Sequence, residues 1–196
     1  MEKVMANVAK VASPRLYTPS EVLEEPVKVP FTPYHLGPAF LIDAIASRKL
    51  DPYMLAVSSI ALDLEGFLVL TLGLRYPLHG YAHTYLAATL AALALTFAAV
   101  SVRRLTGGRL KLLIGGEMRL VPILASALLG LWLHVSLDAP LYPDIRPFYP
   151  IQLNPLYDPS PSSYIDIYIY DACALSFPLA LIAYGLRMLI RRFAKD

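Results

Sequence analysis

The feature that most constrains this chain is a run of 19 residues without a charged side chain, at 84–102. A second run, at 120–137, has 18 residues without Lys, Arg, Asp or Glu. An α-helix rises about 1.5 Å per residue, so each run is long enough to cross most of a hydrocarbon core about 30 Å thick. Only 16% of the chain is charged, against about 25% in soluble domains. The sequence therefore predicts an all-α fold, a polytopic membrane helical bundle.

Two further segments are expected to span the membrane as helices. Residues 53–74 form a run of 22 whose only charges are Asp63 and Glu65, and residues 172–190 form the last apolar run. A helix over 36–47 would be only about 18 Å long, so it is expected to be a half-membrane or interfacial helix. The expected fold has about four spanning helices and this one short helix.

The domain organisation follows from the same pattern. Residues 1–30 are rich in proline and predict an extended N-terminal arm, because each proline disfavours helix at the residue before it. Residues 31–196 are expected to form a single transmembrane domain, with an external loop at 139–168. The chain has 17 prolines and only three Asn and Gln residues, a composition that fits a thermophile.

The basic residues predict the orientation. They gather at 48–49, in the loop 103–119 and at the C-terminus, and cytoplasmic loops of membrane proteins carry an excess of Lys and Arg. The loop 103–119 and the C-terminus are therefore expected in the cytoplasm of an integral cell-membrane protein. A net charge of +2 is too small to indicate nucleic acid, so the expected partner is membrane lipid. The oligomeric state is left open.

Histidines and acids gather at the opposite, external ends of the predicted spans. His79 and His83 are four residues apart, as are His134 and Asp138, and this spacing puts two side chains on one face if the segment is helical. An aspartate inside a span, Asp63, is costly unless it has a partner. The sequence therefore predicts a metal site with these ligands: His35, Asp63, His79, His83, His134 and Asp138. Imidazole and carboxylate ligands without a thiolate favour a divalent ion, Zn²⁺ or Mn²⁺, or a dinuclear site.

Asp63 and Glu65 are expected to differ in role. Residues two apart point to different faces of a regular helix, so either one of them is a ligand or Gly66 distorts the helix. Asp63 is the expected ligand and contributes to catalysis, and Glu65 is the candidate general base for a metal-bound water. In a straight helix Asp63 would lie roughly 16 Å below the end of the run at Leu74, and a tilt, a deep site or a break at Gly66 must close this gap.

The order of these residues resembles that of a known family. The chain has an early Thr-x-x-His, an acidic pair, a His-Gly-x-x-His-Thr element, His-x-x-x-Asp and Pro-Phe-x-Pro, at 32–35, 63–65, 79–84, 134–138 and 147–150. This order resembles the YdjM-like membrane-bound metal-dependent hydrolases, which are similar in ligand order to zinc-dependent phospholipase C. The resemblance covers about residues 31–156. It implies a hydrolase that acts on a phosphoester or lipid through a metal-activated water.

Two other classes of protein remain compatible with the sequence. The same residues could bind an ion without chemistry, in a metal-binding scaffold or transporter. Paired histidines in a helical bundle can also ligate haem, although bis-histidine haem needs one histidine from each of two facing helices and no adjacent acids. The substrate is left open.

Overall fold

The computed structural model describes residues 33–46, 49–106, 119–158 and 164–194. Over these ranges the chain forms six α-helices and one 3₁₀ turn, without a strand, which confirms the all-α prediction. Three helices are long and apolar enough to cross a membrane, and a bent helix pair would make a fourth span. The arm predicted at 1–30 lies outside the described residues.

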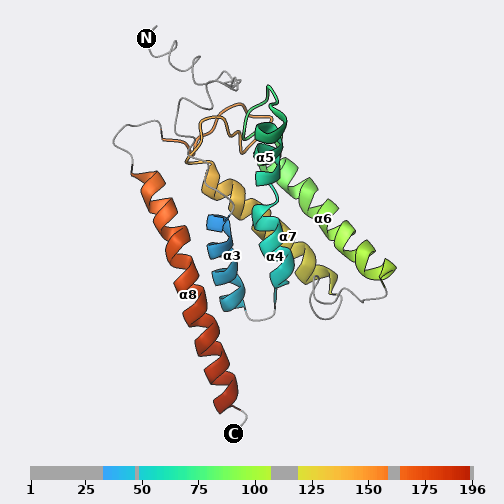
Figure 1. Cartoon of the computed structure of the whole chain (residues 1–196), viewed down its shortest axis with the longest axis vertical. Coiled ribbons are helices and arrows are strands. Elements are labelled where there is room, and N and C mark those ends of the chain that lie inside the picture. The colour runs from blue at the N-terminus through green and yellow to red at the C-terminus, as the bar shows by residue number, and fades with distance from the viewer. Residues whose placement is uncertain (1–32, 47–48, 107–118, 159–163, 195–196) are drawn as a thin grey trace.

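With the bent pair Pro52–Ile60 and Asp63–Leu72 counted as one, the helices run alternately down and up in the view of Figure 1. In chain order the elements are α3 (Pro33–Ala46), α4 (Pro52–Ile60), α5 (Asp63–Leu72), η1 (Tyr81–His83), α6 (Tyr85–Leu105), α7 (Leu120–Asp138) and α8 (Ile165–Phe193). The short helix predicted at 36–47 corresponds to α3, whose 14 residues span about 21 Å. Helix α8 begins at Ile165, so the last residues of the loop predicted at 139–168 belong to this helix.

Two helix starts follow directly from the sequence. Asp51 precedes Pro52, and its carboxylate accepts a hydrogen bond from the Met54 N–H at 2.8 Å. Thr84 caps α6 in the same way, accepting from the Ala87 N–H at 3.0 Å. Both caps satisfy a backbone donor that the first helical turn leaves without a partner.

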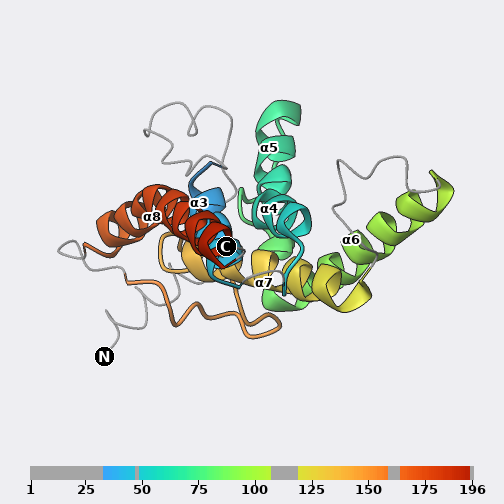
Figure 2. The same cartoon turned by 90° about the horizontal axis from the view of Figure 1, so that it is seen from below.

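The helices pack in a row in which α8 contacts α3, α3 contacts α4, α4 contacts α7, and α7 contacts α6. Figure 2 shows α5 projecting to one side of the other helices. Glycines permit two of the closest approaches. A Cβ at Gly37 of α3 would meet the carbonyl oxygen of Cys173 in α8, and a Cβ at Gly130 of α7 would meet Ser58 in α4. Such small residues allow helix backbones to approach closely, as they do in membrane proteins.

The apolar core lies where α4, α6 and α7 meet. Its buried members come from all three helices and from the α4–α5 junction: Met54, Leu62, Ala88, Ala92, Ile123, Ala127, Leu131 and Val135. The face of α6 that is turned away from this core is exposed, with Leu90 60% and Phe97 75% accessible. Apolar side chains at this exposure suit a helix surrounded by lipid.

The segment predicted to span at 53–74 is not one continuous helix. The structure has two helices, α4 and α5, which are bent by 41° at a break between Ile60 and Asp63. The break lies before Asp63 and not at Gly66. Here Leu64 and Glu65 donate their N–H groups to carbonyls three residues earlier, in place of the four-residue spacing of an α-helix. The break places Asp63 and Glu65 in the first turn of a new helix.

The gap between Asp63 and the histidine pair is closed by the loop after α5. Helix α5 ends at Gly73, which has a φ of 59° and reverses the chain direction. The chain then returns along α5, and a Cβ at Gly66 would lie 3.2 Å from the Leu78 carbonyl oxygen. His79 and His83 therefore lie beside the start of α5. They do not share an α-helix, since His79 is in the loop and His83 is in η1.

Candidate metal centre

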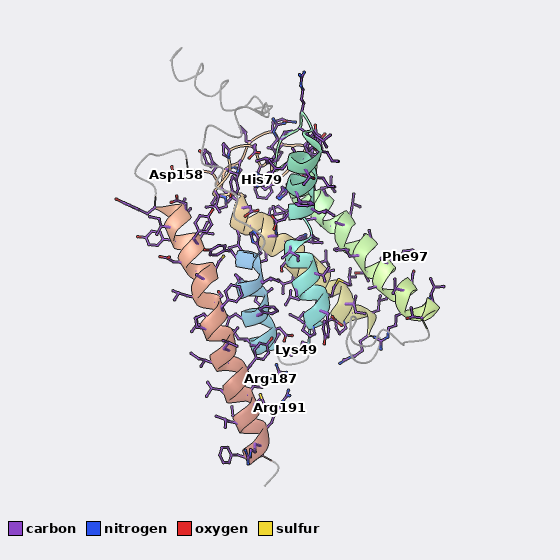
Figure 3. All side chains as sticks on the ribbon, in the orientation of Figure 1. Lys49, His79, Phe97, Asp158, Arg187 and Arg191 are labelled. Atoms are coloured by element: carbon purple, nitrogen blue, oxygen red, sulfur yellow. The ribbon has the colours of Figure 1, made fainter. Side chains whose placement is uncertain are left out.

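The predicted ligands meet at one end of the helix row, around the C-terminal end of α7. Their ligand atoms form two groups, each within 4.8 Å: His35 with Asp63, His134 and Asp138, and His79 with His83 and Asp138. Asp138 belongs to both groups. Figure 3 shows His79 at the same end as Asp158, whereas Lys49, Arg187 and Arg191 lie toward the other end.

Asp138 lies at the centre of the two groups and is fully buried. Its Oδ1 is 3.3 Å from His35 Nε2, and its Oδ2 is 3.1 Å from His134 Nε2 and 4.0 Å from His83 Nε2. Neither carboxylate oxygen has a hydrogen-bond donor that meets ordinary geometry within the described ranges. A buried carboxylate without compensation costs several kcal/mol. Asp138 therefore requires positive charge, from a protonated histidine or from a bound cation.

The break in α4–α5 orients His134. Nδ1 of His134 lies 2.7 Å from the carbonyl oxygen of Ser59, in the last turn of α4. Carbonyls in the last turn of a helix have no partner within it, and a carbonyl can only accept a hydrogen bond. Nδ1 of His134 must therefore carry the proton, and Nε2 is the ring nitrogen that can bind a metal.

Glu65 orients His83 and the loop before it. Its Oε2 accepts from His83 Nδ1 at 2.9 Å and from the Gly80 N–H at 2.9 Å, and its Oε1 accepts from the Ala82 N–H at 3.3 Å. Burial lowers the pKa of His83, against the opposing effect of the Glu65 hydrogen bond. A neutral His83 that donates from Nδ1 presents an unprotonated Nε2, the form in which imidazole binds metals.

Asp144 holds His79 in the same manner, at longer distances. Its two carboxylate oxygens lie 3.3 Å from the His79 backbone nitrogen and 3.3 Å from His79 Nδ1. Burial would raise the pKa of Asp144, but the hydrogen bond and charge of the His79 ring outweigh burial and lower it. The ring of Tyr142 stacks on that of His79 with centroids 4.0 Å apart, which fixes the ring plane.

His35 and Asp63 complete the first group. The His35 ring stacks on the His134 ring at 4.0 Å, and neither of its nitrogens makes a hydrogen bond to the described residues. Asp63 Oδ1 is 3.6 Å from His134 Nε2, and its Oδ2 is buried without a hydrogen-bond partner there. The Asp63 side chain is 21% exposed, whereas those of His134 and Asp138 are inaccessible. Asp63 therefore lies on the side from which a ligand can approach.

Together these contacts form a pattern common at metal sites. There one ring nitrogen of the imidazole binds the metal, and the other donates a hydrogen bond to an oxygen atom. Three of the four histidines have Nδ1 directed to an oxygen, on Ser59, Glu65 or Asp144. Of the buried side-chain atoms without hydrogen-bond partners in the described ranges, all but Thr96 Oγ1 are possible metal ligands, on His35, Asp63, His83, His134 and Asp138. This buried His/Asp group can bind a metal ion, and its nitrogen and oxygen donors suit a divalent cation.

No protein-family model matches this chain. The comparisons with curated proteins and with solved structures likewise find no match.

Sequence reasoning did not assign two of the groups that build the site. Asp144 lies 65 residues from His79, and no local spacing connects the two. The Ser59 carbonyl is a backbone group that becomes available only because the helix breaks. Glu65 was expected to act as a general base, and here its oxygens hold His83 and two backbone N–H groups. A signal for the loop pair was present in Pro77 and Gly80, which favour a turn over a helix.

Proposed function

We propose that this protein is a membrane-embedded metal-dependent hydrolase that acts on a phosphoester or lipid substrate. One observation carries the proposal: Asp138, buried and without a hydrogen-bond donor among the described residues, lies beside three histidine Nε2 atoms, on His35, His83 and His134. The rings of His83 and His134 are held at Nδ1 by oxygen atoms of Glu65 and Ser59. A divalent cation, Zn²⁺ or Mn²⁺, would give the atoms of a group the positive charge that they lack. Because Asp138 belongs to both ligand groups, the arrangement suits two ions that share its carboxylate.

A bound divalent cation supplies a water of lowered pKa and polarises the oxygen of a phosphoryl or acyl group. The residues of the chain prepare this chemistry. The Nδ1 contacts of His134 and His83 leave Nε2 as the ring nitrogen that can bind a metal, and Glu65 and Asp144 fix the loop that carries two of the histidines. Asp63, the partly exposed acid of the centre, lies where it can accept a proton from an attacking water.

The membrane setting is part of the proposal. Lys49, Arg187 and Arg191 lie toward one end of the helices, and His79 of the histidine centre lies toward the other. Cytoplasmic ends are rich in Lys and Arg, so the centre faces the external side of the cell membrane.

The burial of the centre favours a second candidate, a metal-binding membrane protein without enzymatic activity. His83 is 1% exposed and His134 and Asp138 are fully buried, as expected for a structural site with a closed ligand shell. Haem binding is disfavoured, because the His35 and His134 rings stack on each other at 4.0 Å and leave no slot for a porphyrin between them.

The test begins with metal analysis of the purified protein, the Asp138→Asn variant and a control, Asp171→Asn, whose side chain is exposed on α8. We expect stoichiometric zinc or manganese in the wild type and the control, and its loss in Asp138→Asn. Absence of metal from wild-type protein reloaded with either ion would refute a metal centre, and a Soret band would indicate haem. Hydrolysis of p-nitrophenyl phosphate, a bis-ester analogue and phosphatidylcholine vesicles then separates the enzyme from the scaffold. Stoichiometric metal without turnover on any of them would favour the scaffold.

A further inference from the structure

A groove of about 300 Å³ lies on the outer side of the start of α6. Its lining is mostly apolar and aromatic: Tyr81, Thr84, Leu86, Ala87, Leu90 and Tyr149. The rings of Tyr81 and Tyr149 meet edge to face with centroids 5.2 Å apart. The Thr84 hydroxyl donates to the Tyr81 carbonyl and accepts from the Ala87 N–H, so both of these bonds are local. The groove therefore offers mainly hydrocarbon and aromatic surface to a ligand.

The groove faces away from the other helices. Ala88 and Ala92, on the opposite face of α6, are fully buried in the core shared with α7. Leu86 and Leu90 on the groove side are 54% and 60% exposed. Helix α6 is one of the three helices that are long and apolar enough to span a membrane. In a bilayer this side of α6 is surrounded by lipid chains, so the groove opens to hydrocarbon and not to water.

The groove is adjacent to the candidate metal centre along the backbone. Thr84 in its lining directly follows His83, and the N–H groups of Gly80 and Ala82 are bound by Glu65. The segment 80–84 therefore separates the groove from the centre. A molecule with its chain in the groove has its polar end near this segment and the loop that carries Tyr149.

We propose that this groove binds one acyl chain of a membrane phospholipid and so directs the head group toward the metal centre. This names the substrate class of the proposed hydrolase and rests on that function. The size of the groove supports a single chain: its volume is at the lower end of small-molecule sites, about 300–1,000 Å³. Six residues line it, far fewer than the roughly 20–30 per side of a stable protein interface, which argues against a second copy of the protein.

The groove can be filled without changing the metal centre. Ala87→Trp places an indole in the groove, and Ala94→Trp places the same indole on the same face of α6 two turns further on. Leu90→Gln and Leu93→Gln form a second pair that introduces an amide without added volume, at side chains 60% and 52% exposed. These matched controls separate filling of the groove from general effects on a lipid-facing helix.

The experiment uses the full chain in phosphatidylcholine vesicles that contain a phosphatidylcholine with a photoactivatable diazirine in one acyl chain. Crosslinked residues are mapped by mass spectrometry. We expect adducts concentrated at Tyr81, Leu86 and Leu90, and a decrease of at least about tenfold in Ala87→Trp, which corresponds to ~1.4 kcal/mol. Leu90→Gln should lower labelling in the same direction, whereas Ala94→Trp and Leu93→Gln should leave it unchanged.

Equal labelling of Leu86 and the exposed Phe97, or undiminished labelling in both Ala87→Trp and Leu90→Gln, would overturn the acyl-chain site. Metal content is measured on the same samples and stays at the wild-type level in these variants. His134→Ala should lose metal and keep the labelling pattern. Failure of the metal centre and failure of the groove are therefore distinguishable outcomes.

Discussion

Replacing Glu65 by Gln tests how the centre is organised. The carboxylate accepts three hydrogen bonds, two on Oε2 from Gly80 and His83 and one on Oε1 from Ala82. A glutamine side chain has the same length but only one acceptor atom. If the amide oxygen takes the place of Oε2, the NH₂ group faces the Ala82 N–H and cannot accept from it. In the flipped orientation the NH₂ group takes the place of Oε2, and the hydrogen bonds from Gly80 and His83 are lost.

The size of the effect follows from these contacts. At least one backbone N–H loses its acceptor, which costs about 1–3 kcal/mol. The remaining bonds lose the charge of the carboxylate, and charge-assisted bonds are about twice as strong as neutral ones. Loss of such a supporting group lowers metal affinity by about 10–100-fold. We therefore expect Glu65→Gln to weaken zinc binding within that range, or ~1.4–2.7 kcal/mol.

The measurement is competition for zinc against a chelating indicator in detergent solution, with thermal unfolding as a check on the fold. Asp144→Asn is the matched comparison, since Asp144 holds His79 through the same two kinds of contact. Its bonds are 3.3 Å long against 2.9 Å for His83, so we expect a smaller loss of affinity. Zinc affinity of folded Glu65→Gln within about twofold of the wild type would refute the positioning role. Loss of turnover at unchanged affinity would instead identify Glu65 as the general base.

Two further predictions concern stability. Gly130→Ala should destabilise the protein by about 1–3 kcal/mol, because the added Cβ would meet Ser58 at the crossing of α7 and α4. The control variant Gly185→Ala should be neutral or slightly stabilising, because a Cβ at Gly185 would have no atom within 4 Å. Equal melting temperatures for the two variants would contradict this packing. In metal-free protein, burial keeps the pKa of His83 below its ordinary value of about 6.5. As the pH falls, His83 is therefore protonated at a higher pH in the unfolded chain than in the folded protein. The free energy of unfolding should fall as the pH drops through about 6.5 and level off below the folded pKa. Denaturant titrations should show a shallower pH dependence for His83→Gln, and an unchanged slope would exclude His83 as the cause.

Helix positions were predictable where the sequence carries long uncharged runs or strong end signals. Helices α6 and α7 cover residues 85–102 and 120–137 of the two runs, and Pro52 and Thr84 mark helix starts. The break between α4 and α5 was not predictable locally. It falls at Ala61 and Leu62, both good helix formers, and it depends on how α4 meets α7 and His134.

The sequence predicted which residues belong to the site better than it predicted how they are arranged. Charge in an apolar segment and the scarcity of histidine single out the six predicted ligands, and the structure brings their ligand atoms together. The oxygen atoms that accept hydrogen bonds from the histidine Nδ1 atoms could not be predicted from the spacing of residues in the sequence. Asp144 and Ser59 lie 65 and 75 residues from the histidines they hold, so only the folded chain relates them.

The order of the ligands along the chain has a consequence for biosynthesis. His35 leaves the ribosome first, Asp63 and the loop pair follow, and His134 and Asp138 come last with α7. Until α7 joins α4, Asp63 is an acid in an apolar segment without the His134 partner that the finished protein gives it. Helix α8 brings none of the candidate ligands. Metal loading can therefore be completed only after α7 is inserted, and a bound ion would mark a chain whose assembly has passed that step.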